Sequence, residues 1–160
     1  MECIFCKIVA GELPSKKIYE DEDTLAFMDI NPANPGHALV IPKKHYENIF
    51  DIDEQTLKQI ISVTKKVAER INEKLKPEGL NILQNNGKRA GQLVNHIHVH
   101  IIPRFADDKV LFTYQKADVD DFDRIQKEIT VETPEEEPFE EEKKEEPRKE
   151  TISRKWRKDF

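Results

Sequence analysis

The feature that most constrains the fold is a short stretch in which histidines alternate with aliphatic residues. It reads His96, Ile97, His98, Val99, His100, Ile101 and Ile102. Successive side chains of a β-strand point to opposite faces. The alternation therefore predicts a strand over 95–102 with three histidines on one face and an aliphatic face that packs on a helix.

Imidazole side chains suit two kinds of chemistry, and the strand alone leaves both open. One is metal ligation, and the other is nucleophilic or acid–base catalysis near neutral pH. Three histidines at alternate strand positions are too collinear for all of them to reach one ion, although two of them can. We therefore expect a reaction centre at this strand, with a metal site as the competing interpretation.

A second strong pattern predicts a long helix over 54–75. Apolar residues recur there at the helical period, and charged residues fill the other positions. Asp51 or Asp53 can cap its start, Asp51 having Glu54 three residues later as in a capping box, and Pro77 follows its end. The apolar positions are Leu57, Ile60, Ile61, Thr64, Val67, Ala68, Ile71 and Leu75.

The remaining apolar runs are short and read as strands at 17–20, 24–30, 37–42 and 80–84, after a short helix within 3–11. Turn-rich sequence separates them, as in the segment 31–36. We expect an α+β fold: a five-stranded, mainly antiparallel sheet with the long helix packed on it.

Composition divides the chain into three parts. Residues 1–112 have the composition of a normal globular domain, which the alternating histidines make a catalytic one, and 113–130 include a further helical segment over 118–128. Residues 131–160 form a charged C-terminal extension, which is either a solvated tail or a docking segment for an unknown partner. The net charge of −6 argues against binding of nucleic acid along the whole chain.

The first residues show no signal-peptide pattern, and no apolar run approaches the length of a spanning helix, so we expect a cytoplasmic protein away from membranes. In a reducing compartment Cys3 and Cys6 should stay thiols. Their C-x-x-C spacing is compatible with a metal site, with a redox pair, or with two cysteines that have no chemical role. With His45 and His96 they would complete a Cys₂His₂ set for structural zinc, and we expect no organic cofactor.

The alternating stretch fits the His-φ-His-φ-His-φ-φ pattern of the histidine-triad (HIT) family of nucleotide hydrolases and transferases, which this chain resembles over about residues 3–105. The resemblance extends to the segments 3–8, 25–30 and 36–45 and to the Gly-Gln pair at 91–92. The C-x-x-C marks the zinc-containing branch typical of microbial members. The more distant galactose-1-phosphate uridylyltransferases take zinc in a similar way, which supports Cys3, Cys6, His45 and His96 as ligands.

The resemblance implies a different role for each of four histidines. His98 would attack the α-phosphorus and form a nucleotidyl-histidine intermediate that water resolves. The backbone carbonyl of His96 would fix the tautomer of His98. His100 would hydrogen-bond the phosphate oxygens, and His37 would support the triad.

The resemblance also implies nucleotide contacts. Asp29 would bind the ribose hydroxyls, Ile30 would line the nucleoside pocket, and Asn85 and Gln92 would contact the phosphate. Read from the residues alone, Asp29 is also an ordinary turn aspartate, and Asn85 belongs to a good hairpin turn.

Together these expectations predict a hydrolase. It would release a nucleoside monophosphate of the AMP type from a conjugate such as a phosphoramidate or a dinucleoside polyphosphate. The resemblance implies a homodimer with a continuous sheet. Leu93 departs from the phosphoramidase pattern, which has a hydroxyl residue there, because leucine cannot hydrogen-bond a leaving group. The alternatives are a nucleotidyltransferase and a purine-nucleotide binding adaptor with slow turnover.

Overall fold

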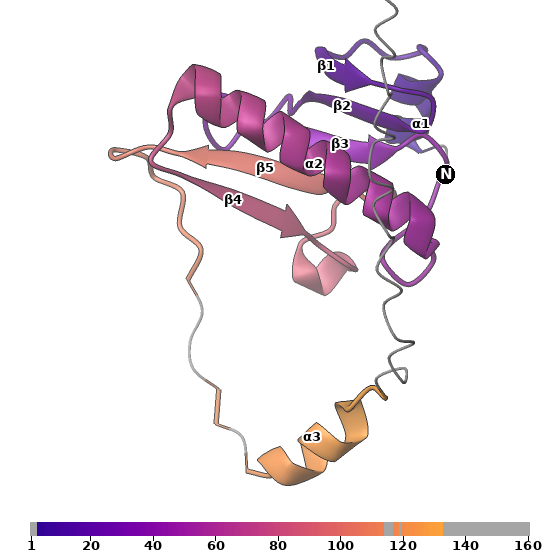
Figure 1. Ribbon diagram of the computed structural model, residues 1–160, viewed down its shortest axis with the longest axis vertical. Helices are drawn as coiled ribbons and strands as arrows, with labels where there is room; N and C mark the ends of the chain where they lie inside the picture. Colours follow the sequence, from indigo (N-terminus) through magenta and orange to yellow (C-terminus); the bar gives the residue numbers. More distant parts are fainter. Residues whose placement is uncertain (1–2, 114–116, 119, 133–160) are drawn as a thin grey trace, which may run out of the picture. The chain divides into compact units, whose positions relative to one another are not determined.

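The computed structural model describes residues 3–113, 117–118 and 120–132. The chain divides into two units, residues 1–114 and 115–160. Figure 1 shows the elements of the first unit as a sheet with a long helix lying across it. These elements are α1 (Ile4–Val9), β1 (Lys17–Glu20), β2 (Thr24–Met28), β3 (Ala38–Pro42), α2 (Glu54–Leu75), β4 (Gly79–Gln84), the 3₁₀ turn η1 (Lys88–Ala90) and β5 (Val99–Arg104).

The sheet has five strands in the order β1-β2-β3-β5-β4, and every neighbouring pair is antiparallel. The expected five-stranded sheet with one long helix is therefore confirmed, and its pairing is wholly antiparallel. Two of the three interior strands, β2 and β3, are buried except at Met28. Two segments distant in sequence, β3 and β5, meet at the middle of the sheet, and this pairing brings His37 beside the histidines of the alternating stretch.

The two faces of the sheet carry separate apolar cores. On one face α2 packs against alternate residues of β2, β3 and β5. On the other face α1 covers the intervening residues of β2 and β3. The α2 core contains Ala26, Ala38, Val40, Ile60, Val63, Val67, Ile71, Val99 and Ile101. The α1 core contains Phe5, Ile8, Leu25, Phe27, Leu39 and Ile41.

Helix α2 begins and ends where the sequence predicts. Asp53 is its N-cap, and its carboxylate accepts a hydrogen bond from the Thr56 backbone N–H at 2.9 Å. Lys76 closes the helix in the left-handed conformation at φ 48°, directly before Pro77. Of the predicted apolar positions, Ile61 and Leu75 remain about half exposed.

The alternating stretch is regular over a shorter range than expected. The strand begins at Val99 rather than at residue 95. The reason is Pro42, which ends β3 and has no N–H to offer the ladder, while its carbonyl accepts from the ring of His96 at 2.8 Å. The Ile97 N–H goes instead to the carbonyl of Tyr46. His96 and His98 therefore lie in an irregular run that leads into β5.

Helix α3 (Phe122–Ile129) is the described element of the second unit, and it begins four residues later than the predicted 118–128 helix. Asp121 caps its start through the Arg124 N–H at 3.0 Å. No residue of α3 is buried. Residues 133–160, which include most of the predicted charged extension, lie outside the described residues. Among the described residues, no helix has the length and apolar character needed to cross a membrane.

Candidate active site and metal centre

The five histidines of the chain fall into two groups. His37, His98 and His100 line a cavity of about 390 Å³, a volume within the usual range for small-molecule sites. His45 and His96 lie beside the two cysteines. The carbonyl of His96 joins the groups, because it accepts the Nδ1–H of His98 at 2.6 Å.

The hydrogen bond to the His96 carbonyl defines the tautomer of His98. A carbonyl oxygen can only accept, so Nδ1 of His98 carries the proton and Nε2 keeps its lone pair. Burial lowers the pKa of His98 below its ordinary value of 6.5. His98 is therefore an uncharged imidazole with one free basic nitrogen on the wall of the cavity.

A second chain of hydrogen bonds defines His37 and His100. The backbone N–H of Ala33 donates to Nδ1 of His37 at 3.0 Å, so the proton of this neutral ring is on Nε2. That Nε2–H donates to Nδ1 of His100 at 2.9 Å. The remaining proton of His100 is then on Nε2, which makes this ring a hydrogen-bond donor next to His98. The His98 and His100 ring centroids are 4.8 Å apart.

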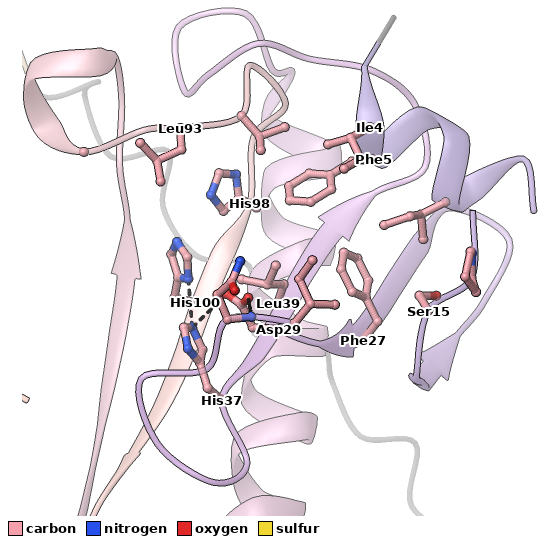
Figure 2. A pocket seen from close by; sticks show the side chains of 16 residues that line it. Ile4, Phe5, Ser15, Phe27, Asp29, His37, Leu39, Leu93, His98 and His100 are labelled. Atoms are coloured by element: carbon pink, nitrogen blue, oxygen red, sulfur yellow. Dashed lines mark hydrogen bonds and ion pairs between the residues drawn. The ribbon is translucent and has the colours of Figure 1, made fainter. Parts of the chain in front are cut away.

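Burial is the first cause of the low basicity of these rings. It lowers the pKa of His100 to about 4, with the neighbouring His98 and His37 rings acting in the same direction. Burial also lowers the pKa of His37, and this effect outweighs the negative charge of Asp29, which acts to raise that pKa. The Asp29 carboxylate is 3.6 Å from Nε2 of His37 (Figure 2). At neutral pH the site therefore offers one imidazole lone pair and one imidazole donor rather than imidazolium charges.

Asn34 holds the turn that carries Ala33 against the end of β5. Its amide donates to the Pro103 carbonyl at 2.8 Å and to the Asp108 carboxylate at 2.9 Å. Asp108 also accepts two hydrogen bonds from Arg104, both at 2.8 Å. This network fixes the 31–36 turn relative to β5, and so fixes His37 relative to His100. None of Asn34, Arg104 and Asp108 is predicted from sequence, because the contacts that tie Asn34 to this network join segments about 70 residues apart.

The rest of the cavity is mainly apolar. Phe5 of α1 contacts the ring of His98 edge-on, with centroids 5.2 Å apart, and also packs on Phe27. Figure 2 shows Phe5 and Phe27 on the side of the cavity opposite His100. Leu93 lines the same cavity beside His98 and is 91% exposed. The other lining residues are Ile4, Ile8, Pro14, Ser15, Asp29, Ile30, Asn31, His37, Leu39, Gly91 and Val94.

The structure places most of the predicted nucleotide contacts at this cavity and two of them beside it. Asp29, Ile30 and His100 line it. Asn85 does not line it, although its side-chain nitrogen is close to Gly91, which does. Gln92 is buried behind the wall.

The amide of Gln92 is engaged within the protein. Its oxygen accepts from the Gly87 N–H at 2.7 Å, and its nitrogen donates to the carbonyls of Glu47 and Val94. These bonds tie the 87–94 loop to the segment after β3. The structure therefore gives Gln92 a role in holding the cavity wall.

The second histidine group forms a possible metal site with the two cysteines. The Sγ of Cys3 is 3.5 Å from Nδ1 of His96, and the Sγ of Cys6 is 3.3 Å from Nδ1 of His45 and 3.6 Å from Nδ1 of His96. A tetrahedral ion with Zn–S near 2.3 Å and Zn–N near 2.05 Å separates sulfur from nitrogen by about 3.6 Å. The four ligand atoms lie within 4.8 Å of one another.

The tautomer of His96 also fits a metal. Its Nε2–H donates to the Pro42 carbonyl at 2.8 Å, which leaves Nδ1 unprotonated and facing the two cysteines. Burial lowers the pKa of His96 to about 4, so that lone pair persists at neutral pH. Cys3, Cys6, His45 and His96 therefore form a candidate Cys₂His₂ metal centre.

Asp29, His37 and His100 form another cluster whose potential ligand atoms lie close together. Hydrogen bonding argues against a metal there. Nδ1 of His37 accepts from Ala33, so Nε2 carries a proton and cannot ligate without breaking that bond. The sequence left open a metal at the alternating histidines, and the tautomers inferred from these hydrogen bonds favour the interpretation based on catalysis.

Comparisons with known proteins agree with this fold. The family model described as "HIT domain" matches residues 10–107. An uncharacterized HIT-like protein of Methanocaldococcus jannaschii is 50% identical over 127 residues, covering 79% of this chain and 98% of its own length. An adenosine 5′-monophosphoramidase of Schizosaccharomyces pombe is 47% identical over 104 residues, covering 65% of this chain and 75% of its own.

Solved structures show the same architecture. A HIT family protein from Bacillus subtilis is similar with a TM-score of 0.70 and 47% identity, over 73% of this chain and 84% of that one. A zinc-bound histidine triad family protein from Mycobacterium smegmatis is similar with a TM-score of 0.66 and 42% identity, over 73% and 85%. The fold and the two groups of histidines thus define a histidine-triad protein. The chain belongs to the HIT domain family.

Proposed function

We propose that the protein is a nucleotide hydrolase that releases AMP from an AMP conjugate through a covalent intermediate on His98. The observation that carries the proposal is the state of His98. Its Nδ1–H is held by the His96 carbonyl at 2.6 Å, and its Nε2 keeps a free lone pair at a cavity of nucleotide size. Membership of the HIT family and the relatives named as adenosine 5′-monophosphoramidases support the same reaction class.

In the proposed first step, Nε2 of His98 forms a bond to the α-phosphorus while the bond from phosphorus to the leaving group breaks. The leaving group takes the electron pair of the broken bond together with a proton from solvent, so an amine leaves in its neutral form. In the second step a water oxygen attacks the same phosphorus and gives its proton to solvent, and the phosphorus–nitrogen bond breaks. The lone pair returns to His98, and AMP is released.

The neighbouring residues would position the phosphate and the nucleoside. The Nε2–H of His100 donates to a phosphate oxygen and becomes a stronger partner as negative charge grows in the transition state. His37 fixes that donor through its 2.9 Å bond to Nδ1 of His100. Asp29 at the cavity wall accepts from the ribose hydroxyls, Ile30 covers the nucleoside, and Asn85 reaches the phosphate from beside Gly91.

Hydrolysis of adenosine 5′-phosphoramidate, followed by chromatography of released AMP, tests the reaction. The parent protein should release AMP, and His98→Asn should reduce the rate by several orders of magnitude because the nucleophile is gone. Lys65→Gln, on the exposed face of α2, is a matched control that should keep the parental rate. A His98→Asn protein that turns over like the parent would refute the proposal.

One feature favours a second candidate, an AMP-binding adaptor with slow turnover. Leu93 is 91% exposed at the cavity beside His98 and has no group that can donate a proton to a leaving amine. The same assay separates the two candidates. An adaptor would bind AMP by calorimetry and release little AMP from any conjugate, whether the leaving group is an amine or a polyphosphate.

We propose that the Cys₂His₂ centre holds Zn²⁺ as a structural ion, since four protein ligands leave no open position. Cys3, Cys6 and His45 would then tie α1 and the segment after β3 to His96, whose carbonyl orients His98. Elemental analysis should find one zinc per chain in the parent and in His98→Asn, and background zinc in a Cys3→Ser, Cys6→Ser double variant. Full zinc content in the double variant would contradict this assignment.

We also propose a homodimer in which β4 pairs with β4 of a second copy. Strand β4 is an edge of the sheet, and Ile82 on it is 47% exposed. Sedimentation should give twice the chain mass of 18.7 kDa for the parent, and the monomer mass for Ile82→Lys. A monomeric parent would contradict the pairing.

For the remainder of the chain we propose the division made from sequence: a catalytic domain over 1–112, a helical segment over 113–130, and a charged extension over 131–160 that is either a solvated tail or a docking segment, in a cytoplasmic protein. A chain truncated after residue 112 should retain AMP release. Loss of activity in a truncated chain that still folds would contradict the division.

A further inference from the structure

The cavity contains a hydroxyl group that the catalytic proposal does not use. Among the described residues, two side-chain oxygens are buried without a hydrogen-bond partner: Oγ of Ser15 and Oγ1 of Thr24. Ser15 lines the cavity. Thr24 is on β2, is 1% exposed and does not line the cavity. A buried hydroxyl without a partner is costly in a folded protein, so each requires an explanation.

Ser15 lies at the end of the cavity away from the reacting histidines. Figure 2 shows it beside Phe27, on the opposite side from His98 and His100. Phe27 belongs to the apolar cluster of Phe5, Ile8 and Leu39, which also line the cavity. The phenyl rings of Phe5 and Phe27 meet edge-on with centroids 5.6 Å apart. This end is therefore an apolar, partly aromatic slot with a hydroxyl at its side.

Such a slot suits a planar, aromatic group that has polar atoms along its edge. The rings and aliphatic side chains cover the faces of the group, while a hydroxyl can both donate and accept at its edge. If the phosphate lies at His98 and His100, the base of the nucleotide is the part of the ligand that reaches this end. The base then supplies the partner that the Ser15 hydroxyl lacks within the protein.

We propose that Ser15 is the residue that hydrogen-bonds the edge of the nucleotide base, an inference that rests on the proposed nucleotide function. The residue lines the cavity while its oxygen is buried in the wall, so a rotation about the Cα–Cβ bond brings the hydroxyl to the base. That rotation breaks no hydrogen bond of the ligand-free protein. The hydrogen bond to the base therefore adds to the binding free energy, because no hydrogen bond within the protein is lost.

The contact is remote from the phosphorus, which determines its kinetic effect. A bond to the base has the same strength before and during the reaction, so its loss raises KM and leaves kcat unchanged. Loss of one neutral hydrogen bond corresponds to about a fivefold weaker affinity.

The test compares Ser15→Ala with Thr24→Val, which removes the other unpartnered hydroxyl at a position outside the cavity. Calorimetry measures binding of AMP, and displacement of AMP measures binding of ribose 5-phosphate, which has no base. In Ser15→Ala the Kd for AMP should rise about fivefold, with ribose 5-phosphate unchanged. Thr24→Val should bind both compounds like the parent. Both variants should unfold at the parental denaturant concentration or above it, because each loses an unpaired buried hydroxyl.

The possible outcomes separate this inference from the proposed function. Parental AMP affinity in Ser15→Ala, an equal loss for AMP and ribose 5-phosphate, or an equal loss of AMP affinity in Thr24→Val would each overturn the role of Ser15. A parent protein that binds no AMP would overturn the nucleotide function itself, and the role of Ser15 with it. A fall in kcat with unchanged KM in Ser15→Ala would also contradict a contact to the base.

Discussion

Replacing Gly36 by alanine tests how tightly the turn before His37 is packed. Gly36 has a φ of +89°, a conformation that L-residues with a side chain rarely adopt. A Cβ atom at this position would lie 2.4 Å from Cδ1 of Leu75 and 3.2 Å from Cγ of Pro103. The substitution therefore combines backbone strain with a clash against the end of α2.

The two contributions can be estimated separately. Alanine in the left-handed region costs about 1–2 kcal/mol. Leu75 is 45% exposed, so its side chain can swing into solvent, and the loss of its remaining burial costs about 1 kcal/mol. We expect Gly36→Ala to lower the free energy of unfolding by about 2–3 kcal/mol in total.

Gly11 provides a matched control, because its φ is +78° and a Cβ atom added there would meet no atom of a non-adjacent residue within 4 Å. Gly11→Ala should cost about 1–2 kcal/mol, the strain alone. In a Leu75→Ala background the cost of Gly36→Ala should fall to the same value, a coupling of about 1 kcal/mol. Urea unfolding followed by circular dichroism measures all four variants. Equal losses for Gly36→Ala and Gly11→Ala, or no coupling to Leu75, would refute the predicted clash.

Three further predictions concern the site and α2. The pKa of His100 is lowered to about 4, so as pH falls below 6.5 the unfolded chain takes up a proton before the folded one does. The free energy of unfolding should therefore fall between pH 6.5 and 4 by up to about 1.4 kcal/mol per pH unit from this residue. Urea unfolding of His100→Gln should show a shallower dependence of this free energy on pH, and an unchanged dependence would contradict the lowered pKa of His100. Leu93→Ser should raise the turnover of a phosphoramidate relative to that of a dinucleoside polyphosphate about fivefold, the value of one hydrogen bond to the leaving group, and an unchanged ratio would place Leu93 away from the leaving group. Asp53→Ala should lower the thermal unfolding midpoint because it removes the cap of α2, whereas Asp51→Ala should not, and the opposite order would contradict the observed cap.

The regular elements follow well from the sequence, because each depends on local periodicity. Helix α2 has the predicted bounds, since its apolar stripe and Pro77 act within the segment itself. The predicted start of β5 is too early because the pattern of alternating side chains contains no information about its partner strand. Pro42, more than 50 residues earlier, ends the ladder.

The candidate site is predictable at the level of residue types and less so at the level of protons. The sequence predicts which histidines act together, but the tautomers of His37 and His100 follow from the backbone N–H of Ala33, which no side-chain pattern reveals. Similarly, the family resemblance predicts a phosphate contact for Gln92 but says nothing of the three backbone groups that its amide engages. Such assignments depend on which carbonyl or N–H lies opposite a ring or an amide, and long-range packing decides that.

The central claim is that Nε2 of His98 is the nucleophile, and a mass measurement of the covalent intermediate tests it most directly. The parent protein is mixed with adenosine 5′-phosphoramidate, quenched at successive times, and analysed as intact protein and as peptides. We predict a transient increase of one AMP group that maps to His98 and is absent in His98→Asn. Turnover without any adduct, or an adduct on a residue other than His98, would contradict it.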